Sequence, residues 1–149
     1  DGVPCGMSGT SWRSVLFQFG RKVIDATLPL GLDKEHGGLI AFTDVDKKPP
    51  VQLEWDMKLW WPQCETMIAL RLAYILFGDE QYNNLYNEFK EYCKKYFCDT
   101  EDGEWYGYLH RDGSVAQPAK GNLFKGPFHV PRMMIRSYML CNDILVANK

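Results

Sequence analysis

The sequence lacks three features that would each indicate a distinct class of protein. It has no block of like charge, because its 17 Lys and Arg and 19 Asp and Glu residues are interspersed and leave a formal net charge of −2. No apolar run approaches the roughly 20 residues that span a bilayer. Residues 1–13 lack the positively charged and apolar regions of a secretory signal. These absences favour a cytoplasmic protein that binds neither nucleic acid nor membrane.

The cysteines also lack the spacing of a structural site. The sequence has five of them, an odd number, without paired CxxC motifs. Neither a closed disulfide framework nor a zinc site is therefore indicated, and we expect no metal. A reducing compartment fits this pattern best.

The chain of 149 residues has the length of one ordinary domain. Its apolar residues recur with the period of a helix in several segments. Apolar spacing predicts a helix over Trp12 to Leu28. From Met57 to Phe77 apolar residues cover the whole helical circumference, which is typical of a buried helix. Gly78 then supplies a stop and Asp79 an N-cap for a helix with a single apolar stripe, including Tyr82, Leu85 and Phe89. A buried helix followed by an amphipathic one predicts an inner and an outer layer of paired helices.

The segments between these helices are rich in turn residues. Gly31 to Pro50 reads as a loop with a short strand at Leu39 to Phe42. Glu104 to Leu109, flanked by Asp-Gly pairs, predicts a short hairpin. Gly121 to Pro131 is a second loop, and Pro131 suits the first turn of a helix that continues to the end of the chain.

Four motifs in order carry a family resemblance. They are DKEHGGL at 33–39, EWDMKLWWPQCE at 54–65, GEWYGYLHRDG at 103–113 and KGNLFKGPFHVPR at 120–132. Together they make residues 16–140 similar to the C-terminal part of the N-acylglucosamine 2-epimerases, also known as renin-binding proteins. The resemblance implies an all-α fold, in which residues 14–149 form part of an (α/α)6 barrel with short hairpin loops. Residues 1–13 have no counterpart and stay unassigned.

The resemblance also implies an activity, the interconversion of N-acetylglucosamine and N-acetylmannosamine without a metal or redox cofactor. It implies ATP as an effector, although the chain has no Walker-type glycine loop, and it implies a homodimer and renin as possible partners. The family uses two histidines on opposite sides of C2 of the sugar, and one of them lies upstream of this sequence. We therefore expect this chain alone to be incomplete and inactive.

Inversion at C2 of an open-chain amino sugar needs groups that exchange protons near neutral pH, for which histidine is suited. His129 stands in the second loop between Lys125 and Arg132, which we expect to bind the substrate and whose charges could stabilise a developing enolate. The residues alone leave open a loop histidine bonded to the backbone, whereas the resemblance assigns His129 an acid/base role.

Other candidates have two readings each. Glu65 is either a buried partner of an arginine or a catalytic carboxylate, and the resemblance favours the latter. Trp61, one turn before Glu65, and Trp105 are either core residues or surfaces on which a sugar stacks. His36 and His110 are expected to be structural, and the acidic cluster at 99–104 a solvated turn. The rival functions are a glycoside hydrolase on the same barrel and a non-catalytic interaction protein.

Overall fold

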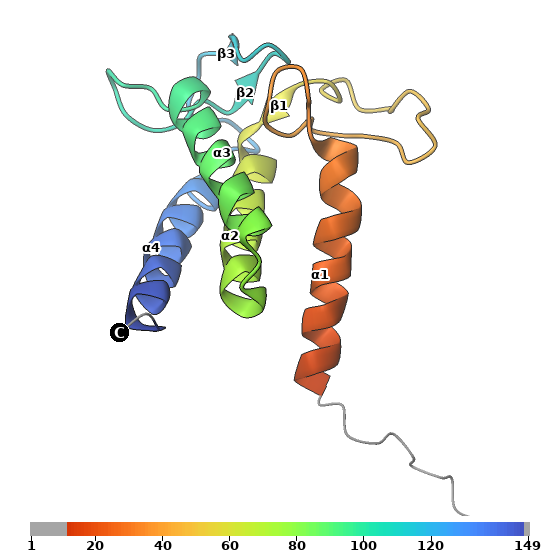
Figure 1. Cartoon of the computed structure of the whole chain (residues 1–149). Helices are drawn as coiled ribbons and strands as arrows, with labels where there is room; N and C mark the ends of the chain where they lie inside the picture. Colours follow the sequence, from red (N-terminus) through yellow and green to blue (C-terminus); the bar gives the residue numbers. More distant parts are fainter. Residues whose placement is uncertain (1–11, 148–149) are drawn as a thin grey trace, which may run out of the picture.

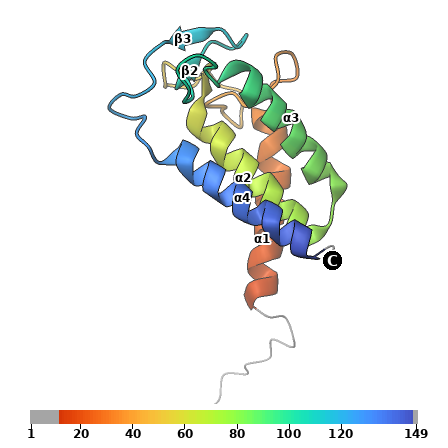
Figure 2. The same cartoon turned by 90° about the vertical axis from the view of Figure 1, so that its left-hand side faces the viewer.

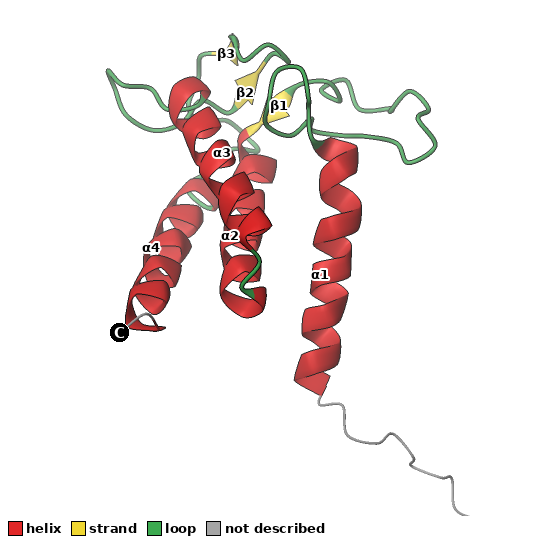
Figure 3. Cartoon of the chain, in the orientation of Figure 1, coloured by secondary structure: helices red, strands yellow, loops and turns green. Residues whose placement is uncertain are grey.

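A computed structural model describes residues 12–147 as helices joined by loops and a small sheet (Figures 1 and 3). The helices are α1 (Trp12–Gly31), α2 (Trp60–Phe77), α3 (Glu80–Tyr96) and α4 (His129–Ala147). The strands are β1 (Lys58–Leu59), β2 (Tyr108–Leu109) and β3 (Val115–Gln117), in the antiparallel order β1-β2-β3. Of the unassigned segment 1–13, residues 1–11 lie outside the described part of the chain.

The direction of the helices decides where their first residues lie. α1 and α3 run toward the sheet, whereas α2 and α4 run away from it (Figure 1). Both α2 and α4 therefore begin at the end of the molecule that carries the strands. The two helices also pack closely against each other, as the view in Figure 2 shows.

Local signals set the boundary between α2 and α3 as the sequence predicts. Gly78 ends α2 in the left-handed conformation, with φ 65°, which glycine adopts without steric cost. Asp79 caps α3, since its Oδ1 accepts a hydrogen bond of 3.1 Å from the Gln81 N–H. The start of α2 lies three residues later than predicted. Lys58 and Leu59 are in the sheet, paired with residues of β2.

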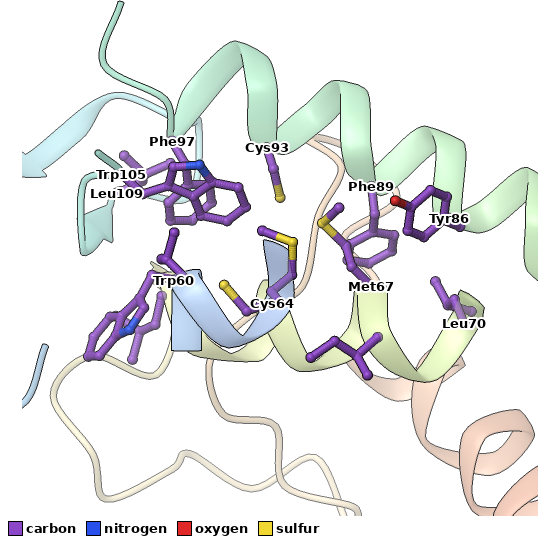
Figure 4. Close-up of a cluster of buried hydrophobic side chains, with 14 of the residues drawn as sticks. Trp60, Cys64, Met67, Leu70, Tyr86, Phe89, Cys93, Phe97, Trp105 and Leu109 are labelled. Carbon is purple, nitrogen blue, oxygen red and sulfur yellow. The ribbon is translucent and has the colours of Figure 1, made fainter. Parts of the chain in front are cut away.

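The core fills the space between α2, α3 and the hairpin (Figure 4). α3 buries one face only, which confirms the predicted stripe: Tyr82 is 2% and Phe89 3% exposed. α2 contributes Trp60, Cys64, Met67 and Leu70 to the same core. Each large apolar side chain buried in this way contributes about 1.5–3 kcal/mol.

The prediction that α2 is buried on every side is wrong for the described chain. Leu72 is 42% and Leu76 40% exposed, because α3 and α4 cover only part of the helix and α1 contacts it less than they do. α1 likewise exposes Leu16 and Phe19, each 65% accessible. The apolar pattern thus marks surfaces that residues 12–147 leave uncovered.

The loops follow the predictions in part. A hairpin forms, but it lies later than the predicted 104–109: β2 at 108–109 pairs with β3 at 115–117, and Gly113 in the turn between them has φ 92°. The strand expected at Leu39 to Phe42 is reduced to an isolated bridge between Leu39 and Leu32. The physical reason is that the backbone N–H groups after Leu39 do not follow one partner strand, since Ile40 donates to the Gly31 carbonyl and Ala41 to the Met57 carbonyl, each at 2.9 Å. Within the described residues no helix combines the length and apolarity needed to cross a bilayer.

Candidate functional site

Glu65 and His129 stand 64 positions apart in sequence and meet in the structure. The Nδ1 atom of His129 lies 2.9 Å from Oε1 of Glu65. Glu65 is in the second turn of α2 and His129 is the first residue of α4. Because both helices begin at the sheet end and lie side by side, their first turns face each other (Figures 1 and 2).

The start of α4 also brings a third charged residue to this pair. Pro131 occupies the first turn, where its missing N–H costs no helical hydrogen bond, so the predicted helix start is confirmed to within two residues. The first helical bond runs from the Arg132 N–H to the Phe128 carbonyl at 3.0 Å. Arg132 then pairs through its guanidinium with Oε2 of Glu65, the carboxylate oxygen that His129 does not use.

The charges around Glu65 decide which ring nitrogen of His129 carries the hydrogen that is bonded to the carboxylate. Burial raises the pKa of the Glu65 carboxyl, but hydrogen bonds from Arg132 and His129 outweigh it and leave the pKa below its ordinary value. An ionised carboxylate only accepts hydrogen bonds, so Nδ1 of His129 is the donor. No residue in the described range 12–147 hydrogen-bonds to Nε2, and the side chain is 29% exposed. Nε2 can therefore exchange a proton with a ligand.

Aromatic rings surround the imidazole. The rings of Trp61 and His129 are 6.2 Å apart between centroids, and Phe128 stands edge-on at 4.9 Å. Trp60 lies 6.4 Å away on the same helix but is 3% exposed, so it supports the site from the core. Trp61 is half-buried and shares with Glu65 the face of α2 that meets His129. Sequence reasoning missed Phe128, whose apolar character resembles that of any core residue.

Trp105 and Lys125 do not offer their side chains to the surface beside His129. Trp105 is 4% exposed and packs against Phe97, with 5.6 Å between ring centroids (Figure 4). Lys125 is also 4% exposed, and its Nζ donates to Glu104 Oε1 at 3.2 Å and to the Lys120 carbonyl at 2.7 Å. A role in substrate binding stays a prediction for both, and their burial favours a supporting role.

The other two histidines, His36 and His110, lie in turns. His36 lies 3.7 Å from Glu35 in its turn, and His110 is exposed in the hairpin turn. The acidic cluster at 99–104 is a solvated turn as expected at Glu101, Asp102 and Glu104, which are exposed, whereas Asp99 is largely covered and pairs with Lys120. Glu104 also accepts a hydrogen bond from Lys125. No cluster of three or more His, Cys, Asp or Glu side chains within residues 12–147 is placed to hold a metal ion.

One buried ion network escaped the sequence analysis. Lys58 is fully buried, and its Nζ donates to Asp33 Oδ2 at 2.8 Å and to the Gly37 carbonyl at 2.6 Å. Arg111 donates to both oxygens of the same carboxylate, at 2.8 and 2.9 Å. Hydrogen bonds from Arg111 and Lys58 hold the pKa of Asp33 well below its usual range despite its burial. Each of the three motifs contains several charged residues, and nothing in their order indicates that Asp33, Lys58 and Arg111 meet.

This network fixes the start of the helix that carries the site. Asp33, Lys58 and Arg111 come from the first three motifs, so the network binds these segments to one another. Lys58 stands two residues before α2, and Trp61 and Glu65 follow in the first two turns. The position of these two side chains therefore depends on the buried pair.

A family model and the related proteins both identify the same family. The family model described as N-acylglucosamine 2-epimerase (GlcNAc 2-epimerase) matches residues 7–126, ending just before His129. The N-acylglucosamine 2-epimerase of Rattus norvegicus is 48% identical over 131 residues, which are 85% of this chain and 30% of the rat protein. The chain thus spans about a third of the length of this relative.

Two solved structures share the fold. A D-mannose isomerase superposes with a TM-score of 0.73 at 22% identity, over 85% of this chain and 31% of its own. The cellobiose 2-epimerase from Spirochaeta thermophila gives 0.75 at 24% identity, over 95% of this chain and 33% of its own. Both are of the (α/α)6 barrel type, which confirms the predicted partial barrel of paired helices.

Proposed function

The chain belongs to the N-acylglucosamine 2-epimerase family, and from that premise we propose that its protein interconverts N-acetyl-D-glucosamine and N-acetyl-D-mannosamine by proton transfer at C2. The observation that carries the proposal is the contact of His129 with Glu65 beside Trp61. A carboxylate that receives the Nδ1 hydrogen leaves Nε2 of the imidazole basic and directed away from the carboxylate. Such a pair suits proton exchange with a carbon acid.

The reaction acts on the open-chain sugar. Nε2 of His129 removes the proton at C2, and the electron pair of the broken C–H bond moves into an enolate with the C1 carbonyl. A second group, which we propose to be a histidine from another part of the barrel, returns a proton to the opposite face of C2. Glu65 stabilises the imidazolium formed on His129, and Arg132 keeps Glu65 ionised. No cofactor enters these steps.

Substrate binding is assigned to the exposed side of the pair. Trp61 offers a half-buried ring beside His129, on which the apolar face of the sugar stacks. Arg132, with 36% of its side chain exposed, supplies a positive charge next to the carboxylate. We place Trp105 and Lys125 behind this surface, because both are almost completely buried.

The complete protein provides the test. In heavy water, turnover should place deuterium at C2 of the product, and His129→Asn should lower kcat by at least about 10²-fold, because Asn retains hydrogen bonding but cannot transfer a proton near pH 7. His110→Asn is the matched control, since His110 is exposed in the hairpin turn and should keep the wild-type rate. A His129→Asn protein with more than about a tenth of the wild-type kcat would contradict the assignment.

Some features are proposed on family membership alone. They are a homodimer, ATP as an effector without a role in the chemistry, renin as a possible protein partner, and a cytoplasmic location. The glycoside hydrolase alternative is less well supported, since a hydrolase needs a protonated carboxyl as acid, whereas Arg132 and His129 keep Glu65 ionised.

A further inference from the structure

We propose that Lys125 is a positioning residue for His129, and that Glu104 in the acidic turn is the anchor through which it acts. The inference rests on the proposed function, because it concerns the histidine to which that function assigns proton transfer. It gives Lys125 a different task from the substrate binding expected from the sequence. It also gives the acidic turn a task, where the sequence indicated only solvation.

Lys125 is held from several directions although it lies in a loop. Its Nζ donates to Glu104 Oε1 at 3.2 Å and to the carbonyl of Lys120 at 2.7 Å. Its backbone N–H donates to Asn122 Oδ1 at 2.8 Å, and its carbonyl accepts from the Asn122 N–H at 3.2 Å. With only 3% of its side chain exposed, the ammonium depends on these partners and not on water.

The stem of Lys125 packs at the base of the site. A β-carbon at Gly107 would lie 2.8 Å from Cδ of Lys125 and 3.6 Å from Cε3 of Trp60, so the absence of a side chain at Gly107 lets the lysine pass. The backbone N–H of Trp60 donates to the Gly107 carbonyl at 3.1 Å, and the Trp60 ring stands edge-on to His129, with 6.4 Å between ring centroids. Lys125 thus lies on a continuous path of contacts to the imidazole.

The acidic turn is shaped to receive this lysine. Glu104 has a left-handed backbone with φ 64°, a conformation uncommon outside glycine. Its Oε1 also accepts a hydrogen bond from the backbone N–H of Trp105 at 2.7 Å, which fixes the carboxylate toward Lys125. An ion pair also holds the start of the loop that carries Lys125, since Lys120 pairs with Asp99. Asp99 in turn accepts a hydrogen bond of 3.0 Å from the Tyr106 hydroxyl.

These ties matter because only three residues separate Lys125 from His129. Among the described residues Glu65 provides the one hydrogen bond to the imidazole. The backbone that precedes His129 is a loop, in which Leu123 is 91% and Phe124 76% exposed. Without the buried lysine this loop has few apolar contacts to keep it in place. A displacement of about 1 Å at a reacting group costs on the order of 10² in rate.

The test uses Lys125→Met and Glu104→Gln in the complete protein. Met keeps most of the aliphatic stem and Gln keeps the shape of Glu104, so each variant removes mainly the charge. We expect kcat to fall by about 10² in Lys125→Met and by about 10 in Glu104→Gln, with KM within about threefold of wild type. Glu101→Gln is the matched control, because Glu101 is an exposed acid of the same turn and should keep wild-type kcat.

A second readout is independent of activity. In protein labelled with ¹⁵N-histidine, the Nδ1–H signal of His129 should shift or broaden in Lys125→Met if the imidazole has moved away from Glu65. Wild-type protein that exchanges C2 protons, together with a Lys125→Met variant of unchanged kcat, would overturn the positioning role and leave the proposed function standing. Wild-type protein without exchange would overturn the proposed function. In that case the Nδ1–H signal of His129 alone tests the positioning role of Lys125, and a signal that is unchanged in Lys125→Met refutes that role.

Discussion

Replacement of Asp33 by asparagine should destabilise the protein more than any other single change in its ion network. Lys58 has no exposed surface and Asp33 1% of its side chain exposed, so neither charge can be hydrated when its partner is lost. Removing one partner of a buried pair typically costs about 3–5 kcal/mol. The introduced amide would also place its NH₂ group, which only donates hydrogen bonds, beside the Lys58 ammonium. We therefore expect the free energy of unfolding to fall by an amount within that range.

The two cations of the network should differ in their effects. Arg111→Met should cost about 0.2–1 kcal/mol, because 43% of the arginine side chain is exposed and water replaces the lost contact. Lys58→Met should lower the free energy of unfolding by more than Arg111→Met but by less than Asp33→Asn, since Asp33 keeps both hydrogen bonds to Arg111. The double variant Asp33→Asn/Lys58→Met should lose less than the sum of the two single variants, because it leaves no unpaired buried charge.

Urea unfolding of the four variants in the complete protein measures these free energies. Circular dichroism follows the loss of helix, and an unchanged m-value shows that each variant unfolds from a similar folded state. A loss below about 1 kcal/mol for Asp33→Asn would place the pair in a hydrated environment. Additive single and double variants would likewise contradict the coupling of Asp33 to Lys58.

Two further predictions concern the chain in solution. The isolated chain of 149 residues should self-associate, because Trp12 and Phe19 on α1 and Ile135 and Tyr138 on α4 are 60–77% exposed, and a monodisperse monomer in sedimentation velocity would contradict this. Unfolding should become easier as pH falls below about 4, since the pKa of Asp33 is lower in the folded than in the unfolded state, where it is about 3.9. The stabilisation is complete above the unfolded pKa and is lost as pH falls toward the folded one. Asp33→Asn should weaken this dependence of the free energy of unfolding on pH, as measured by urea unfolding at several pH values.

Local signals in the sequence determined where α2 ends and where α3 and α4 begin, whereas α1 runs past its predicted end at Leu28 to Gly31. The Gly78 stop, the Asp79 cap and the stripe of Tyr82 and Phe89 act within one or two turns, so the sequence predicts them without knowledge of the fold. Pro131 marks the start of α4 in the same way. The four ordered motifs determined the family, because together they identify a barrel that no single motif would.

Burial on particular faces could be predicted less well. The apolar circumference of α2 indicates contacts on all sides, but it does not identify the neighbours that provide them. In residues 12–147 those neighbours cover part of the helix, so Leu72 and Leu76 stay exposed. Trp105 shows the same ambiguity, since a tryptophan suits both a sugar-binding surface and the core in which it lies.

Tertiary structure alone decided which charged side chains meet. Glu65 reaches His129 over 64 positions, and Arg111 reaches Asp33 over 78, because α2, α4 and the hairpin converge at one end of the helices. Sequence supplies the residue types for such pairs, but their contact depends on helix direction and packing, which no local pattern encodes. Lys125 illustrates the difference: its charge beside His129 suggested binding of a substrate, and only its burial against Glu104 directs it to the support of the loop.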